Sequence, residues 1–156
     1  MLYLIPRPLH RLALRLAYRA RKHYRGLVKP PIAGVSLIIE DEAGRILLVR
    51  HSYGPRGWAL PGGGMGRGEA PQAAARREIA EEMGCGVAGI ELLSSHCEML
   101  HGAPHTAFVF AVRLAGEPRA DMREIEELRW FAREELPGLT ITRLSRARLT
   151  ENGRHP

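Results

Sequence analysis

The order of apolar and polar residues divides this chain into a body of alternating strands and helices and a separate first segment. Short apolar runs between turn residues predict strands, and apolar positions three or four residues apart predict helices. The predicted strands cover residues 32–40, 45–50, 58–60, 87–93 (with a continuation to 100 left open), 105–114 and 125–131. The predicted helices cover 71–84, a turn over 132–136 that ends at Pro137, and 141–149. This mixture of strands and helices predicts an α/β sandwich.

The first 31 residues differ from the rest of the chain in both pattern and charge. From Leu9 onward, apolar residues recur at helical spacing with arginines between them, which predicts a basic amphipathic helix. The segment holds eight of the 23 basic residues and none of the 17 acidic ones, so the remainder carries 15 bases against 17 acids. The net charge of +6 therefore belongs to this segment. Pro30 and Pro31 end the helix and predict a boundary.

Three interpretations of this segment stay open. The helix can dock on its own domain or on a second copy of the chain, which would make a homodimer. It can also lie on an anionic membrane surface, as basic amphipathic helices do. The third interpretation is nucleic-acid binding through charge, but we expect no specific nucleic acid because no recognition module accompanies the arginines.

Length and composition indicate one ordinary globular domain. The chain has 156 residues, of which 45% are hydrophobic and 26% charged. We expect a basic segment over 1–31, the main domain over 32–150 and a tail over 151–156. Cys85 and Cys97 have neither disulfide-framework nor metal-ligand spacing, which favours a cytoplasmic location. Membrane binding by the first segment would make that location membrane-peripheral, since no apolar run is long enough to span a bilayer.

Three glutamates gather at the C-terminal end of the predicted helix 71–84, where negative charge is unfavourable. Glu78, Glu81 and Glu82 share an arc of about 100° on a helical wheel. Each like-charge pair costs roughly 0.2–0.5 kcal/mol, and each anion in the last turn roughly 0.3–1 kcal/mol more. The other face of the helix is apolar. We call these three residues the acidic face; a solvated surface and a cation site are the two interpretations of it.

The loop before this helix favours the cation site. Residues 61–69, "PGGGMGRGE", contain five glycines in nine positions, so that the backbone can approach a ligand closely. We call this segment the Gly-rich loop. Carboxylates beside exposed backbone groups suit Mg²⁺, which binds through a few carboxylates together with substrate phosphates.

The same residues resemble a known motif. Gly63, five residues, Glu69, seven residues and then "REIAEEMGC" (77–85) fill every fixed position of the Nudix box, G-x5-E-x7-R-E-U-x-E-E-x-G-U, where U is aliphatic. Cys85 occupies the last aliphatic position, where a buried cysteine behaves as a small hydrophobe. The chain therefore resembles a Nudix hydrolase, and the resemblance implies an α/β/α sandwich with a mixed β-sheet.

The resemblance also implies roles for individual residues. Nudix hydrolases cleave a pyrophosphate bond with Mg²⁺ or Mn²⁺, and the implied metal ligands here are Gly63, Glu78, Glu81 and Glu82. Glu81 is also a candidate for activating the water. Arg77 is expected to orient a glutamate, and the implied structural residues of the loop are Gly62, Gly64 and Glu69. The family often adds a base on a late loop; among Glu124, Glu126 and Glu127 we favour Glu124, and a charged strand end remains the alternative for each.

The substrate is less well specified by the sequence. Residues just before the box are candidates for contacts with a base or ribose: Arg50, Tyr53, Arg56 and Trp58. For Trp58, packing is the stronger alternative. His96, His101 and His105 do not have zinc-site spacing, and His101 or His105 is a candidate for contact with a phosphate.

The expected activity is hydrolysis of a small nucleotide, either an ADP-ribose-like nucleoside diphosphate derivative or a nucleoside triphosphate. The alternatives are a Nudix-fold module that senses a nucleotide and an RNA 5′-end pyrophosphohydrolase. Sensor modules usually have degraded boxes, whereas this box keeps all its acids.

Overall fold

The computed structural model describes residues 9, 12–13, 16–17, 32–100 and 103–154 of the chain. The predicted basic helix and the interpretations attached to it lie almost entirely outside these residues, as does His101, and they stay predictions. No helix within the described part of the chain is long and apolar enough to cross a membrane.

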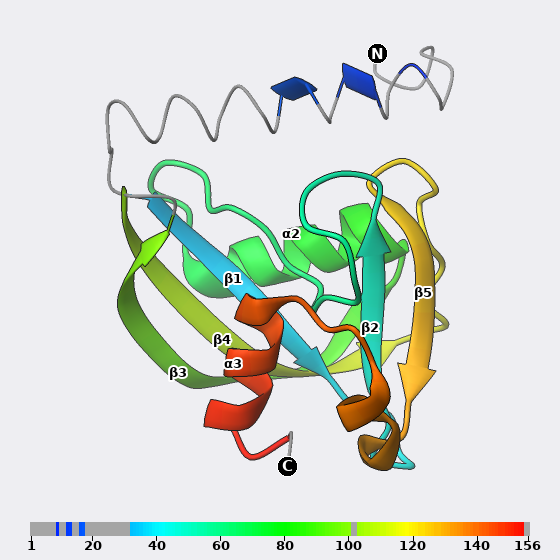
Figure 1. The fold of residues 1–156 in the computed structure, drawn as a ribbon. Coiled ribbons are helices and arrows are strands. Elements are labelled where there is room, and N and C mark those ends of the chain that lie inside the picture. Colours follow the sequence, from blue (N-terminus) through cyan, green and yellow to red (C-terminus); the bar gives the residue numbers. More distant parts are fainter. Residues whose placement is uncertain (1–8, 10–11, 14–15, 18–31, 101–102, 155–156) are drawn as a thin grey trace.

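Five strands and three helical segments build the described body (Figure 1). The strands are β1 (Ile32–Ile39), β2 (Ile46–His51), β3 (Gly86–Leu100), β4 (Ala103–Ala115) and β5 (Ile125–Phe131). The helical segments are α2 (Pro71–Met83), the 3₁₀ helix η2 (Arg133–Gly138) and α3 (Arg143–Glu151). The elements predicted from residue 32 onward are present within a few residues of their expected ends, with one exception: residues 58–60 form only isolated bridges, of Ala59 with Val49 and of Trp58 with Ile141. The open question about β3 is settled in favour of the longer strand.

The strands form two sheets. β4 lies in the middle of a three-stranded mixed sheet, parallel to β1 and antiparallel to β3. β2 and β5 form an antiparallel pair. β1 and β2 follow each other in sequence, and Gly44, in the turn between them, has a positive φ of 74°. The two strands nevertheless lie in different sheets, and an isolated bridge joins Glu40, just after β1, to Ile46 of β2.

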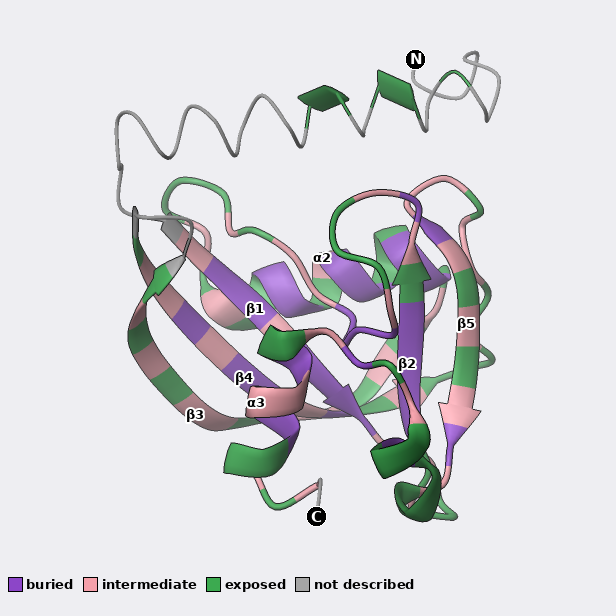
Figure 2. Ribbon diagram, in the orientation of Figure 1, coloured by how far each residue is buried: buried purple, intermediate pink, exposed green. Residues whose placement is uncertain are grey.

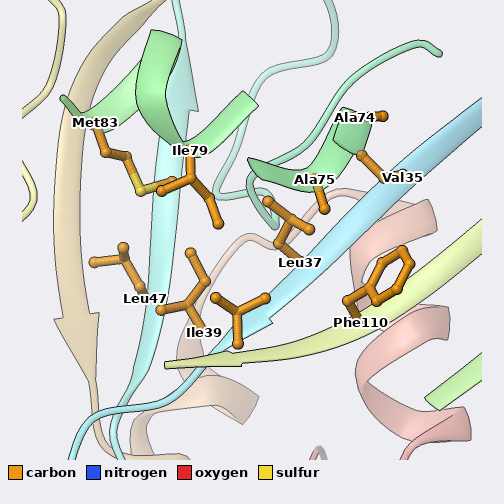
Figure 3. Packing of buried hydrophobic residues seen from close by; sticks show 10 residues of the cluster. Val35, Leu37, Ile39, Leu47, Ala74, Ala75, Ile79, Met83 and Phe110 are labelled. Atoms are coloured by element: carbon orange, nitrogen blue, oxygen red, sulfur yellow. The ribbon is translucent and has the colours of Figure 1, made fainter. Parts of the chain in front are cut away.

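Helices cover both faces of the three-stranded sheet, which confirms the predicted α/β/α sandwich. Alternate residues of a strand point to opposite faces, and the core accordingly has two parts. Figure 2 shows the buried residues that β1, β2, β4 and α2 contribute to it. One part joins β1 and β4 to α2, through residues that include Leu37, Phe110 and Ile79 (Figure 3). The other joins the opposite face of the same strands to α3, through Ile38 and Leu149 among others.

Helix α2 has the ends that the sequence predicts. Pro71 occupies the start of the helix, where its missing N–H would have no partner inside the helix. Gly84 adopts a left-handed conformation with φ 64° and caps the C-terminus. The apolar face formed by Ala75, Ile79 and Met83 is buried against the sheet, which leaves the acidic face to meet the Gly-rich loop.

Backbone hydrogen bonds fix the Gly-rich loop beside β1. The amides of Val35 and Leu37 donate to the carbonyls of Gly63 and Pro61, each at 2.9 Å. Gly62 has φ 138°, and a Cβ there would overlap the carbonyl oxygen of Val35. The loop can therefore follow the strand this closely because residue 62 has no side chain.

This contact yields a stability prediction. Gly62→Ala should lower the free energy of unfolding by about 2 kcal/mol or more, because it combines an unfavourable φ with a clash against backbone. Gly64→Ala is the matched control, since a Cβ at Gly64 meets no atom within 4 Å; its effect should stay within about 0.5 kcal/mol. Chemical denaturation of both variants measures the difference, and equal stabilities would contradict this account of the loop.

Candidate active site

The carboxylate of Glu78 lies directly against the Gly-rich loop. Only 9% of the residue is exposed, and a Cβ built on Gly63 would overlap the Glu78 carboxylate. Any side chain at position 63 would therefore displace that carboxylate. Helix α2 and the Gly-rich loop are therefore in contact through the Glu78 carboxylate and the backbone of Gly63.

Arg77 joins the helix to the loop through its planar guanidinium. Its Nε and Nη2 donate to the two carboxylate oxygens of Glu69 at 2.8 and 3.0 Å, a bidentate pair. Nη2 also donates to the carbonyl of Gly64 at 2.9 Å. Nη1 donates to Glu78 at 2.8 Å and to Glu81 at 3.1 Å. One side chain therefore contacts both the loop and the acidic face.

Glu69 closes the loop on itself. Its carboxylate accepts a hydrogen bond from the amide of Gly66 at 2.7 Å in addition to those from Arg77. The hydrogen bonds from Arg77, followed by that from Gly66, lower the pKa of Glu69 to about 2. Glu69 is consequently ionised at neutral pH and can hold the guanidinium in place.

Glu82 is buried without a counter-charge. The residue is 3% exposed, and its Oε2 has no hydrogen-bond partner among the described residues. Burial, and then the neighbouring Glu78, raise the pKa of Glu82 well above its ordinary value. Burial also raises the pKa of Glu78, although Arg77 opposes that shift. A buried carboxylate with an unsatisfied oxygen is unfavourable unless something positive binds it.

A loop that carries Glu124 is fastened to the end of α2. The amides of Arg119 and Asp121 donate to the carbonyls of Met83 and Glu82 at 3.0 and 3.1 Å, and so satisfy the last turn of the helix. The Asp121 carboxylate in turn accepts hydrogen bonds from the amides of residues 123, 124 and 125. These bonds place Glu124 near the acidic face.

Glu124 is the late-loop glutamate whose charge acts on the buried pair. Its charge contributes to the raised pKa values of both Glu78 and Glu82. The Tyr53 hydroxyl donates to Glu124 Oε2 at 2.9 Å. Glu127, by contrast, accepts a hydrogen bond from Arg50 at 2.9 Å on the exposed side of β5.

Of the other residues predicted to bind substrate, Trp58 is buried and Arg56 is exposed. Trp58 is 5% exposed, packs edge-on against Phe131 with ring centroids 4.7 Å apart, and is covered by the Arg50 guanidinium at 4.4 Å. This arrangement favours the packing interpretation of Trp58. Arg56 is exposed in the loop after β2.

The donor set fits a hard divalent cation that binds together with a substrate. No group of three or more His, Cys, Asp or Glu side chains among the described residues forms a preassembled metal site. Two buried carboxylates, an unsatisfied Glu82 oxygen and adjacent backbone carbonyls are nevertheless the kind of incomplete oxygen shell that Mg²⁺ completes with water and phosphate oxygens.

Two features of the site were missed from sequence. The anchoring role of Asp121 has a weak signal, because aspartate often accepts hydrogen bonds from amides two to four residues later in a turn. The contact between Tyr53 and Glu124 has no sequence signal, since 71 residues separate the partners.

Comparisons with known proteins agree with this architecture. The family model described as NUDIX domain matches residues 30–152. The crystal structure of a MutT NUDIX hydrolase from Burkholderia pseudomallei is similar, with a TM-score of 0.67 and 33% identity over 78% of this chain and 97% of that one. The fold and the intact box therefore define the class: this chain belongs to the Nudix family.

Curated relatives are similar over shorter stretches. Nudix hydrolase 19, chloroplastic, from Arabidopsis thaliana is 34% identical over 113 residues, which is 65% of this chain and 24% of the relative. An RNA pyrophosphohydrolase from Saccharophagus degradans is 39% identical over 59 residues, 38% of this chain and 35% of the relative. The chain thus spans about a quarter to a third of the length of these curated relatives.

The burial of Glu82 predicts how stability changes with pH. Because folding raises the pKa of Glu82, its contribution to stability is fully present below the unfolded pKa and is lost as the pH rises through the folded pKa. In metal-free buffer, Glu82→Gln should therefore be more stable than the unmodified chain at about pH 8, by about 1–3 kcal/mol, and the difference should shrink towards about pH 5.

Denaturant titrations in EDTA at several pH values measure this difference. Groups common to both proteins, such as Glu69, cancel in the comparison. A difference that does not change with pH would contradict the uncompensated burial of Glu82.

Proposed function

We propose that this protein is a divalent-cation-dependent hydrolase that cleaves a pyrophosphate bond in a nucleoside diphosphate-linked substrate. The observation that carries the proposal is the pair of buried carboxylates, Glu78 and Glu82, set against the backbone of the Gly-rich loop on the helix of a complete Nudix box. A binding surface for a neutral ligand would not need this unfavourable arrangement of negative charge.

The acidic face and the loop would hold the cation. We assign Glu78 and Glu82 as the principal ligands, with Glu81 and the Gly63 carbonyl as further oxygen donors. A bound Mg²⁺ or Mn²⁺ would polarise phosphoryl oxygens and lower the pKa of a bound water. Glu81 is 60% exposed at its side chain, so it remains accessible to a cation or a water that arrives with the substrate.

Arg77 acts on the glutamates rather than on the substrate in this proposal. Its five hydrogen bonds end on Glu69, Glu78, Glu81 and the Gly64 carbonyl. These bonds support a role of Arg77 in orienting the Glu78 carboxylate, because groups that hydrogen-bond to metal ligands generally fix the orientation of those ligands. Glu69 braces the loop in the same arrangement.

We assign the general base to Glu124. The hydrogen bond from Tyr53 orients one carboxylate oxygen, and the amides held by Asp121 fix the backbone that carries it. In the reaction Glu124 would accept a proton from the attacking water. Tyr53 is accordingly a positioning residue for this base in the proposal, and its predicted contact with the substrate stays a prediction.

The substrate class is a small nucleotide, such as an ADP-ribose-like diphosphate or a nucleoside triphosphate. An RNA 5′-end substrate is the second candidate, supported by the similarity to RNA pyrophosphohydrolases over about 60 residues. A nucleotide sensor without turnover is the third. A cytoplasmic setting is supported by two cysteines that are both free thiols.

Replacement of one buried ligand should separate catalysis from folding. Glu82→Gln should lower kcat with Mg²⁺ by at least about 100-fold, because it removes an anionic oxygen donor while keeping the side-chain shape. Glu91→Gln, on the exposed part of β3, is the matched control and should keep full activity. The assay is product identification on a panel of ADP-ribose, nucleoside triphosphates and 5′-triphosphorylated RNA.

The outcome of the panel decides between the three functions. Cleavage of small nucleotides supports the proposal, and cleavage of RNA alone supports the second candidate. Tight nucleotide binding without any turnover would replace the enzyme by a sensor. Full activity of Glu82→Gln would refute the assigned site.

A further inference from the structure

The imidazole of His105 borders Gly34 of β1, close to the Gly-rich loop, and one of its ring nitrogens has no partner among the described residues. The side chain, on β4, is 10% exposed. A Cβ built on Gly34 would lie 3.1 Å from His105 Nε2 and 2.9 Å from the carbonyl oxygen of Gly63. His105 Nε2 and the Gly63 carbonyl oxygen are therefore both close to Gly34. Gly34 lies on β1 and forms a bridge with Gly64 of the Gly-rich loop. Nε2 is therefore at most about 6 Å from the Gly63 carbonyl oxygen, one of the proposed cation ligands.

The hydrogen-bond character of Nε2 follows from the partner of the other nitrogen. His105 Nδ1 lies 3.1 Å from Oε1 of Glu98. An ionised carboxylate only accepts hydrogen bonds, so Nδ1 carries the ring proton in neutral imidazole and Nε2 is an acceptor. Nε2 has no partner among the described residues.

A buried arginine holds this arrangement in place. The side chain of Arg148, on α3, is 3% exposed and donates to the same Glu98 oxygen as His105. It also donates to Glu151 at 3.2 Å. Because α3, β3 and β4 each supply one member of this chain of contacts, the ring of His105 cannot easily turn away from Gly34.

We propose that His105 is a specificity-determining residue whose Nε2 accepts a hydrogen bond from a ribose hydroxyl of the substrate. The inference rests on the proposed function, since it places a diphosphate at the acidic face. In a nucleotide the ribose adjoins the phosphates, and its hydroxyls are donors. A ribose hydroxyl both donates and accepts, so it can pair with Nε2 in either protonation state of the ring. A phosphate oxygen only accepts, and it can pair with Nε2 only when the ring is doubly protonated. The site therefore selects ribonucleotides over 2′- or 3′-deoxyribonucleotides.

The test compares ribonucleotides with their deoxy forms in catalysis and in binding. We expect ATP or GTP to exceed its 2′-deoxy or 3′-deoxy counterpart in kcat/KM by roughly three- to tenfold, the effect of one hydrogen bond. Calorimetric Kd values for ADP, 2′-deoxy-ADP and 3′-deoxy-ADP with Mg²⁺ should show the same ratio. Equal values for all three, or no binding, would overturn the inference.

Two variants separate recognition from packing. His105→Phe keeps a planar ring and leaves Glu98 paired with Arg148. It should weaken ribonucleotide binding to the level of the deoxy form and leave the deoxy form unchanged, whereas a purely structural role would weaken both equally. His96→Phe is the matched control, because His96 faces Glu151 and Ser94 instead; it should keep the preference. Thermal unfolding checks both variants, and His105→Ala replaces the Phe variant if that one does not fold.

Failure of this inference and failure of the proposed function give different results. Mg²⁺-dependent hydrolysis with no preference between ribo and deoxy forms would reject the role of His105 alone. A ribose preference in binding without hydrolysis would support His105 and reject the enzyme.

Discussion

The structure depends on the burial of two carboxylates, those of Glu78 and Glu82, against the glycines of the Gly-rich loop. Glu78 and Glu82 lie on one face of α2, and the adjacent face is fixed in the core by Ile79 and Met83. The helix therefore cannot rotate to expose its acids without exposing its apolar face. The loop can lie over them because Gly62 and Gly63 have no side chains to collide with Val35 and Glu78.

The charges around this contact do not balance within the described residues. Arg77 pairs with Glu69, Glu78 and Glu81 but donates no hydrogen bond to Glu82. Glu124 adds further negative charge, which contributes to the raised pKa of Glu82 after burial and Glu78. One guanidinium therefore pairs with three carboxylates, and Glu82 can be neutralised only by a proton or by a cation from solution. This deficit of positive charge supports the proposal that a divalent cation binds at the site.

Helix α2 and the gathering of its glutamates could be predicted from local features of the sequence. The ends of α2 follow from Pro71 and Gly84, and the gathering of the glutamates follows from helical geometry. The contacts made across the fold were not predictable. The separation of β1 and β2 into different sheets and the proximity of His105 to Gly34 depend on pairing between distant strands. Such pairing is set by tertiary packing, and local propensity contains little of it.

Anomalous diffraction from crystals soaked in Mn²⁺ with a nucleoside diphosphate tests the central claim most directly. We expect a manganese peak coordinated by carboxylate oxygens of both Glu78 and Glu82, with a phosphate oxygen completing the shell. A manganese ion bound elsewhere, with Glu82 still buried and unsatisfied beside a bound nucleotide, would contradict it.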